Sequence, residues 1–281
     1  MRITFILQIA DYTGGNRVVA SHAAELARRG HRVVVVSRPV ARVKLAKQLK
    51  RWVKGEPWRQ PANLGSHLDG IDVEHRRLDT SRRVVDGDVP DADVVVATWW
   101  ETAEWVADLS PSKGAKVYFL QGLESTIDGQ PVERVEATWR LPMHKITVAR
   151  WLVDVARERF SDPNASLVPN SVDAAQFAGP ERGKQPVPTA GFINSGLSPN
   201  KGCDIVLAAL REAKRQLPAL RGVCFGFKPP PAERPLPPWV DVHVGPDQDQ
   251  IPGLYGRCDA FLHGSRVEGF LAAGHAAAIT G

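Results

Sequence analysis

Short, unbroken apolar runs recur along this chain and alternate with longer segments whose apolar residues have helical spacing. In the first half, the runs lie at residues 3–9, 33–36, 94–97 and 117–120. The helical segments cover residues 18–28, 41–54, 99–108 and 148–160. Strands rich in Val and Ile throughout are typical of a parallel sheet that helices cover on both faces. The alternation therefore predicts an α/β fold with a doubly wound parallel sheet.

The same alternation begins again after a segment rich in proline and glycine, AGPERGKQPVPTAG, at residues 178–191. Such composition indicates a linker. Beyond it we expect strands at 190–194, 223–227, 240–244 and 260–263, with helices at 203–216 and 250–255. The 281 residues suffice for two domains of ordinary size. We predict a first Rossmann-like domain at residues 1–175 and an incomplete second one at 186–281.

The composition is that of a globular protein, with 43% hydrophobic and 24% charged residues. No apolar run approaches the roughly 20 residues that a membrane-spanning helix needs. The apolar start of the chain is short and runs into Asp11, which favours a buried strand over a signal peptide. The three cysteines, Cys203, Cys224 and Cys258, lack metal-site spacing. We expect them to be reduced core residues of a cytoplasmic protein.

The net charge of +5 is concentrated between residues 28 and 59. Within this stretch, ARVKLAKQLKRWVK (41–54) places apolar residues along one stripe, surrounded by six Lys or Arg residues and Trp52. A basic amphipathic helix with an aromatic residue predicts peripheral binding to an anionic membrane surface. A solvated helix on a basic protein is an equally good interpretation. Nucleic acid is not an expected partner, because no recognised binding module accompanies the charge.

Polar or glycine-rich segments follow five of the predicted strands, at residues 11–16, 98–101, 121–124, 195–202 and 264–268. Ligands of open parallel sheets bind beyond the carboxyl ends of the strands, where these segments lie. Lys201 stands at the start of a predicted helix, where a positive charge is unfavourable unless an anion is bound beside it. A solvated surface lysine is the alternative.

We expect no metal ion and no other cofactor. Three Asp-x-Asp triplets, at 86–88, 91–93 and 247–249, have the spacing of a divalent metal site. Turns and helix caps explain acidic residues at these places better. The G-x-G-x-x-G pattern of dinucleotide-binding enzymes is absent, which counts against a nicotinamide enzyme.

Four motifs occur in the order found in retaining glycosyltransferases of the GT-B architecture: Gly14-Gly15, VPNSVD (168–173), SGLSPNKG (195–202) and SRVEGF (265–270). The chain resembles this family, of the glycosyltransferase family 4 or group 1 type. The resemblance implies a hexosyltransferase that moves a sugar, with retention, from a nucleotide-sugar donor to a glycan or lipid-linked acceptor. It implies that the protein synthesises cell-envelope polysaccharide without a bound metal. It also implies a cytoplasmic location, with peripheral binding to the inner face of the membrane.

The resemblance also assigns roles to single residues. Lys201 would hold the donor diphosphate. Glu268 would be the catalytic residue facing the transferred sugar, together with the backbone amides of Gly269 and Phe270. Gly15 would bring backbone amides toward the donor phosphate or the acceptor. Acceptor-side candidates, which serve equally well as caps or surface residues, are Glu101, Gln121 and Glu124.

The sequence departs from the family pattern at two positions. Gly196 stands where the family often has an arginine as a second phosphate ligand, and Arg266 is a nearby candidate in the sequence to replace it. Ala276 stands where the family has a second glutamate, commonly on the ribose hydroxyls. We expect a chain truncated at its C-terminus, and the alternative function is a non-catalytic homologue that binds only acceptor or membrane. A sugar-nucleotide epimerase, which needs histidines and acids in its cleft, is a further alternative.

Overall fold

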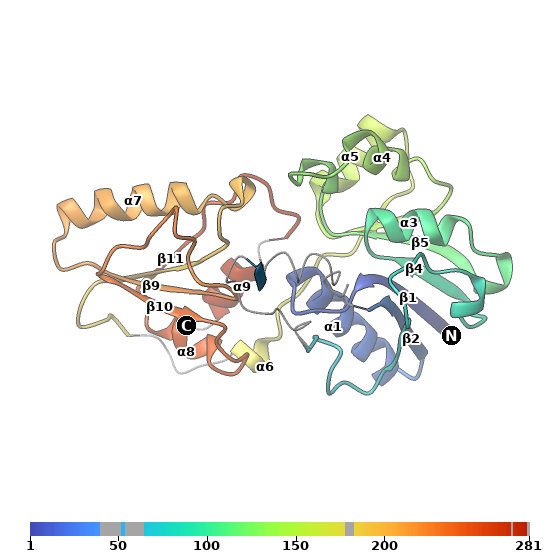
Figure 1. Cartoon of the computed structure of the whole chain (residues 1–281), viewed down its shortest axis with the longest axis horizontal. Coiled ribbons are helices and arrows are strands. Elements are labelled where there is room, and N and C mark those ends of the chain that lie inside the picture. Colours follow the sequence, from blue (N-terminus) through green and yellow to red (C-terminus); the bar gives the residue numbers. More distant parts are fainter. Residues whose placement is uncertain (40–51, 54–64, 178–182, 271, 280–281) are drawn as a thin grey trace. The chain divides into compact units, whose positions relative to one another are not determined.

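The structure is a computed structural model that describes residues 1–39, 52–53, 65–177, 183–270 and 272–279. It divides the chain into two compact units, Met1–Pro169 and Asn170–Gly281 (Figure 1). Each unit is built on a parallel sheet flanked by helices, so the predicted fold class is confirmed.

The first unit has a seven-stranded sheet in the order β3-β2-β1-β4-β5-β6-β7, with every pair parallel. The order reverses between β1 and β4, so the loops that follow these strands diverge. The strands are β1 (Arg2–Ile9), β2 (Arg32–Arg38), β3 (Glu74–Arg77), β4 (Val94–Ala97), β5 (Ala115–Leu120), β6 (His144–Thr147) and β7 (Ser166–Leu167). The helices are α1 (Gly14–Arg28), α3 (Trp100–Ala107), α4 (Val132–Thr138) and α5 (Arg150–Phe160), with 3-10 turns η1 (Asp86–Asp88), η2 (Pro111–Lys113) and η3 (Glu124–Thr126).

The second unit has a four-stranded parallel sheet in the order β10-β9-β8-β11. Its strands are β8 (Thr189–Ile193), β9 (Arg221–Gly226), β10 (Val240–Val244) and β11 (Ala260–Leu262). Its helices are α6 (Ala174–Phe177), α7 (Cys203–Gln216), α8 (Ile251–Gly256) and α9 (Ala272–Ile279), with the 3-10 turn η4 (Pro199–Lys201). Helix α7 covers one face of this sheet, and α8 and α9 cover the other (Figure 1).

The apolar runs of the sequence form the cores of both units. Val35 and Val36 in β2 are fully buried, as is Val95 in β4. Cys203, Cys224 and Cys258 are all buried and unbridged, as the sequence predicts. Burial raises the pKa of the Cys224 thiol to about 12, so this thiol is protonated and unreactive at neutral pH.

Strands β6 and β3 are among the elements that the sequence does not predict, and polar residues occupy both. Strand β6 contains Lys145, which is only 4% exposed and whose Nζ lies 2.8 Å from Asp162 Oδ2. Strand β3, Glu74–Arg77, is an edge strand made of charged residues and histidine. Neither segment has the apolar run that predicts a buried strand.

The division between the units also differs from the predicted boundary at residue 175. The second unit begins at Asn170 and includes α6. The reason is the packing of Phe177, which is 2% exposed and contacts Tyr255 with 6.1 Å between ring centroids. The VPNSVD motif therefore contains the boundary.

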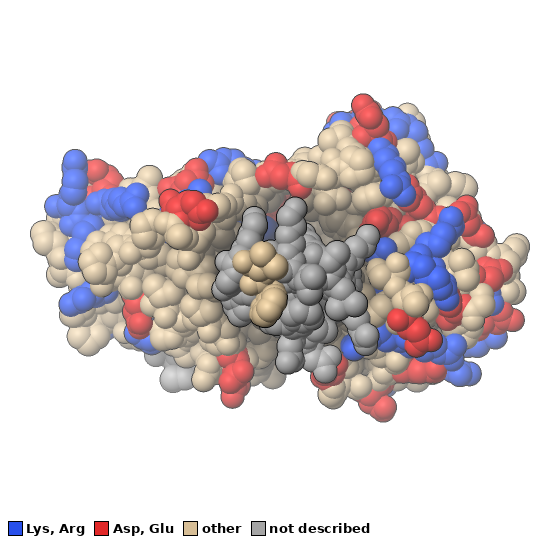
Figure 2. All heavy atoms as spheres, viewed as in Figure 1, with Lys and Arg blue, Asp and Glu red and all other residues tan. Residues whose placement is uncertain are grey.

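The structure leaves the predicted membrane contact open. Of the basic segment 41–54, all but residues 52 and 53 lies outside the described residues, so membrane binding stays a prediction. No helix in the described part of the chain is long and apolar enough to cross a membrane. On the face shown in Figure 2, basic and acidic side chains are intermixed over the described parts of both units.

A buried glutamate ties β5 to the start of α3. Glu124 is 4% exposed, and its Oε2 accepts hydrogen bonds from the backbone N–H of Trp100 at 2.7 Å and the hydroxyl of Tyr118 at 2.9 Å. Burial raises the pKa of Glu124 to about 8, although these two hydrogen bonds act in the opposite direction. The folded protein therefore favours the protonated carboxyl group at neutral pH.

This carboxyl group predicts a pH-dependent stability. The pKa of Glu124 is about 8 in the folded state, against an ordinary value of 4.5. The protonated carboxyl group therefore makes a contribution to the free energy of unfolding that is complete below pH 4.5 and is lost as pH rises through 8. We expect Glu124→Gln, which keeps the shape, to remove on the order of 2–4 kcal/mol of this pH-dependent loss. Urea unfolding at several pH values checks it, with the exposed Glu133→Gln as control. An unchanged pH profile in Glu124→Gln contradicts the assignment.

Candidate functional site

The second unit presents its polar loops at the point where strand order reverses. Strands β8 and β11 are neighbours in the sheet although β9 and β10 separate them in sequence. The loops after these two strands, residues 194–202 and 263–270, leave the same edge in diverging directions. Ligands of open parallel sheets bind in this crevice. Lys201 lies on the first loop and Glu268 on the second.

The two residues are in direct contact. Lys201 Nζ donates a hydrogen bond to Glu268 Oε1 at 2.7 Å. The same oxygen accepts a hydrogen bond from Ser265 Oγ at 2.7 Å and lies 3.2 Å from His263 Nε2. The side chain of Lys201 remains 44% exposed and that of Glu268 24%, so both are open to a ligand. The structure thus brings together the two residues that the family resemblance assigns to the donor, whereas their roles stay predictions.

These contacts fix the charge of Glu268. Its partial burial alone would raise the pKa. Hydrogen bonds from His263, Lys201 and Ser265 outweigh burial and lower the pKa to about 2. At neutral pH the site therefore holds a carboxylate beside an ammonium group.

Two glycines bring the loops together. Gly202 has φ +56°, and a Cβ atom there would lie 1.9 Å from the carbonyl oxygen of Gly264. A Cβ atom at Gly264 would in turn lie 2.4 Å from the carbonyl oxygen of Gly202. The backbone N–H of Arg266 also donates to the carbonyl of Asn200 at 2.8 Å. Only glycine fits this backbone contact, which sets the separation of the ammonium and the carboxylate.

Arg266 braces the same contact and is not a free cation. Its Nη2 lies 2.8 Å from Asp204 Oδ2 in the first turn of α7, and its Nη1 donates to the carbonyl of Pro199. The hydrogen bond from Arg266 lowers the pKa of Asp204 to about 2. That Arg266 replaces the arginine missing at Gly196 stays a prediction, and in this structure its guanidinium is paired with Asp204.

The remaining residues that the sequence analysis singles out in this unit come after Glu268 in the chain. Gly269 and Phe270 are half-buried in the loop after β11, directly beyond Glu268. Ala276 lies in α9, is 4% exposed and packs in the apolar core with Tyr255. The place of the second glutamate of the resembled family is therefore a buried core position in this chain.

In the first unit, the acceptor-side candidates lie beyond the carboxyl ends of β4 and β5. Gln121 Nε2 donates to the carbonyl of Gly15 at 3.1 Å, so these two predicted residues meet. Glu101 Oε2 accepts hydrogen bonds from Gln8 and, at 3.3 Å, from Arg38 Nη2. This polar cluster lies beside the reversal between β1 and β4, where a ligand is expected.

Glu124, the third acceptor-side candidate, does not fit that role. Its carboxyl group is buried and bound to Trp100 and Tyr118 within the first unit. The sequence pattern placed it correctly after a strand, but periodicity does not reveal that the side chain turns into the core.

Several residues of these clusters were missed in the sequence. Gln8 is the penultimate residue of β1, Arg38 is the last residue of β2, and His263 and Ser265 follow β11. All four lie at the carboxyl ends of predicted strands, and this position in the sequence is the signal by which they can be found.

Three of the six Asp-x-Asp carboxylates pair with cations instead of each other: Asp88 with Arg82, Asp91 with Lys113 and Asp93 with Arg2. The described residues contain no group of three potential metal ligands from His, Cys, Asp and Glu.

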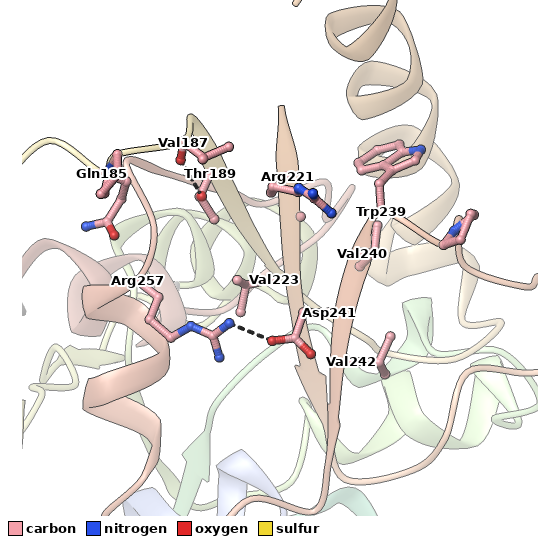
Figure 3. Close-up of a pocket in the computed structure, with 13 residues that line it drawn as sticks. Gln185, Val187, Thr189, Arg221, Val223, Trp239, Val240, Asp241, Val242 and Arg257 are labelled. Carbon is pink, nitrogen blue, oxygen red and sulfur yellow. Dashed lines mark hydrogen bonds and ion pairs between the residues drawn. The ribbon is translucent and has the colours of Figure 1, made fainter. Parts of the chain in front are cut away.

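A large cavity lies at the other end of the second sheet. Its volume is about 720 Å³, and it is lined by the amino ends of β8, β9 and β10 with Trp239 and Arg257 (Figure 3). Arg257 Nη2 lies 2.6 Å from Asp241 Oδ2 in this cavity. We assign the site to the carboxyl ends, because ligands of open parallel sheets bind there and Lys201 and Glu268 meet there.

No protein-family model matches the sequence, and no curated protein matches it. Solved structures do match its fold. A variant of S. aureus TarM bound to Fondaparinux, alpha-GlcNAc-glycerol and UDP is 8% identical, with 99% of this chain and 84% of that chain covered and a TM-score of 0.74.

Two further structures match with lower scores. WaaG, a glycosyltransferase involved in lipopolysaccharide biosynthesis, is 14% identical, covers 99% of this chain and 79% of its own, and has a TM-score of 0.58. A proposed UDP-N-acetylglucosamine 2-epimerase from Listeria monocytogenes is 10% identical, covers 93% and 73%, and has a TM-score of 0.55. At these identities the likeness establishes the fold of two Rossmann-like units.

The glycine contact predicts a position-specific loss of stability. We expect Gly202→Ala to destabilise the second unit by about 1–3 kcal/mol, because it adds a Cβ atom in the left-handed region against the carbonyl of Gly264. Gly253→Ala in α8 is the control, since a Cβ atom there meets nothing within 4 Å. Denaturant unfolding of both variants measures the difference. Equal stabilities would show that the loops can separate at no cost.

Proposed function

We propose that the protein is a retaining glycosyltransferase that moves a sugar from a nucleotide-sugar donor to a glycan or lipid-linked acceptor. The observation that carries this proposal is the Lys201–Glu268 pair at the strand-order reversal of the second sheet. Both charges a glycosyl donor needs are present there, a cation for its diphosphate and a carboxylate for its sugar. The fold shared with TarM and WaaG supports the same function.

Lys201 acts on the leaving group. As the glycosidic bond breaks, positive charge develops on the sugar and negative charge grows on the diphosphate. The ammonium of Lys201, just before the N-terminus of α7, lies where it stabilises that negative charge. An ammonium group has three N–H donors, and the contact with Glu268 uses one of them, so Lys201 has donors to offer to phosphate oxygens.

Glu268 orients the sugar. Its carboxylate accepts hydrogen bonds and is held in place by Ser265 and Lys201, which suits it to bind sugar hydroxyls. The backbone amides of Gly269 and Phe270 continue this surface. We propose no covalent attack by Glu268 on the sugar.

The acceptor binds the first unit in this proposal. Glu101, Gln121 and the loop at Gly15 supply the polar groups for its hydroxyls. A cell-envelope glycan, often lipid-linked, agrees with the fold shared with WaaG and with the basic segment 41–54 as a contact to an anionic membrane surface on the cytoplasmic side. We expect no metal, no other cofactor and no nucleic-acid partner.

A sugar-nucleotide epimerase is the second candidate, and one observation favours it. His263 Nε2 lies 3.2 Å from Glu268 Oε1, so the site combines a histidine with an acid. The epimerase-like fold match agrees with this arrangement. Product analysis separates the three alternatives: a transferase releases nucleoside diphosphate only with an acceptor sugar, an epimerase changes the sugar without one, and a non-catalytic homologue does neither.

Donor binding tests the proposal directly. We expect calorimetry with UDP-, ADP- and GDP-sugars to give binding to at least one of them. Lys201→Ala should weaken that binding about 10- to 100-fold, because a charge-assisted hydrogen bond is lost. Turnover should fall by about 10²- to 10³-fold, as for the loss of one donor to the transition state. The exposed Lys184→Ala is the control for loss of a positive charge.

The proposal fails if the wild-type protein binds none of these nucleotide sugars. It also fails if Lys184→Ala and Lys201→Ala have the same effect, because the effect is then one of net charge and not of the site.

A further inference from the structure

The proline-rich loop after β9 returns to the carboxyl end of the second sheet. The sequence KPPPAERPLPPW (228–239) predicts only a stiff surface segment. In the structure, Asn194 Nδ2 donates to the carbonyl of Lys228 at 2.8 Å, and Arg234 Nη1 donates to the carbonyl of Gly196 at 3.2 Å. The loop thus attaches to the same segment, residues 194–202, that carries Lys201.

Arg234 is a cation without a carboxylate partner in the described part of the chain. Its hydrogen bonds go to a backbone carbonyl, whereas Arg266 nearby in the unit is bound to Asp204. A guanidinium group has five N–H donors, and the contact with Gly196 uses one of them. Gly196 has φ +67°, a backbone conformation that favours glycine, and its carbonyl oxygen accepts the hydrogen bond from Arg234. Positive charge is therefore available beside the loop that holds Lys201.

The loop holds Arg234 in place before any ligand binds. The backbone N–H of Arg234 donates to the carbonyl of Pro231 at 2.9 Å, and Pro235 follows directly. Further on, Leu236 and Trp239 pack against the apolar cluster beneath α7. Prolines restrict the backbone, so little conformational entropy is lost when the arginine binds a ligand.

We propose that Arg234 is the second cation of the donor site and binds the diphosphate of the nucleotide sugar together with Lys201. This inference rests on the proposed function. The planar guanidinium matches two phosphate oxygens at once, which a lysine cannot do. Two cations from loops after β8 and β9 then face one diphosphate, while Glu268 from the loop after β11 faces the sugar.

Calorimetry with UDP, ADP and GDP as probes tests this role. We expect the diphosphate that binds the wild-type protein best to bind Arg234→Gln about 10- to 100-fold more weakly. Arg234→Lys should lie between the two, because it keeps the charge and loses the two-point contact. Arg221→Gln is the matched control: Arg221 starts β9 at the opposite end of the same sheet and is exposed. Circular dichroism of each variant verifies that it is folded.

The outcomes separate this inference from the proposed function. If the wild-type protein binds a diphosphate, Lys201→Ala weakens it and Arg234→Gln does not, the role of Arg234 is wrong and the proposed function stands. If Arg221→Gln weakens binding as much as Arg234→Gln, the effect is one of net charge and the inference is overturned. If the wild-type protein binds none of the three diphosphates, the proposed function and the inference fall together.

Discussion

The candidate site depends on one backbone contact, between Gly202 and Gly264. Any side chain at either position would overlap the carbonyl oxygen of the other, so this separation of the loops requires glycine at both. The strand order places the two loops at one edge of the sheet, but only the glycine contact brings them near enough for Lys201 and Glu268 to meet at 2.7 Å. An ion pair of 2.8 Å between Arg266 Nη2 and Asp204 Oδ2 also joins the loop after β11 to the first turn of α7.

The Lys201–Glu268 ion pair positions the two side chains and leaves both of them accessible to a ligand. Both side chains are partly exposed, and ion pairs of this kind contribute only about 0–1 kcal/mol to stability. An anionic ligand that offers Lys201 a stronger partner therefore displaces the contact at little cost. Glu268 does not become an isolated charge when this happens, because the hydroxyl of Ser265 still donates to it at 2.7 Å. The carboxylate keeps its position while the lysine turns to the ligand.

The sequence predicts what depends on local pattern and misses what depends on distant partners. The runs of Val and Ile mark β2 and β4, and the motifs around Lys201 and Glu268 mark the two site loops. Strand β6 is invisible to that pattern because Lys145 occupies its interior, with Asp162 as a partner that only the fold provides. The pairing of Arg266 with Asp204 is likewise hidden from the sequence, because the two residues are 62 positions apart and are neighbours only in space.

The charges at the carboxyl end of the second sheet explain why one more cation matters there. Arg266 and Asp204 cancel, and Lys201 already faces Glu268, so these four residues offer no net positive charge to a diphosphate. Position 276 supplies no further polar group, because Ala276 is buried in the core. A ligand that carries two or three negative charges therefore needs positive charge from a segment outside these two loops. The proline-rich loop meets that need, because it holds the guanidinium of Arg234 against the carbonyl of Gly196, in the segment 194–202 that also carries Lys201.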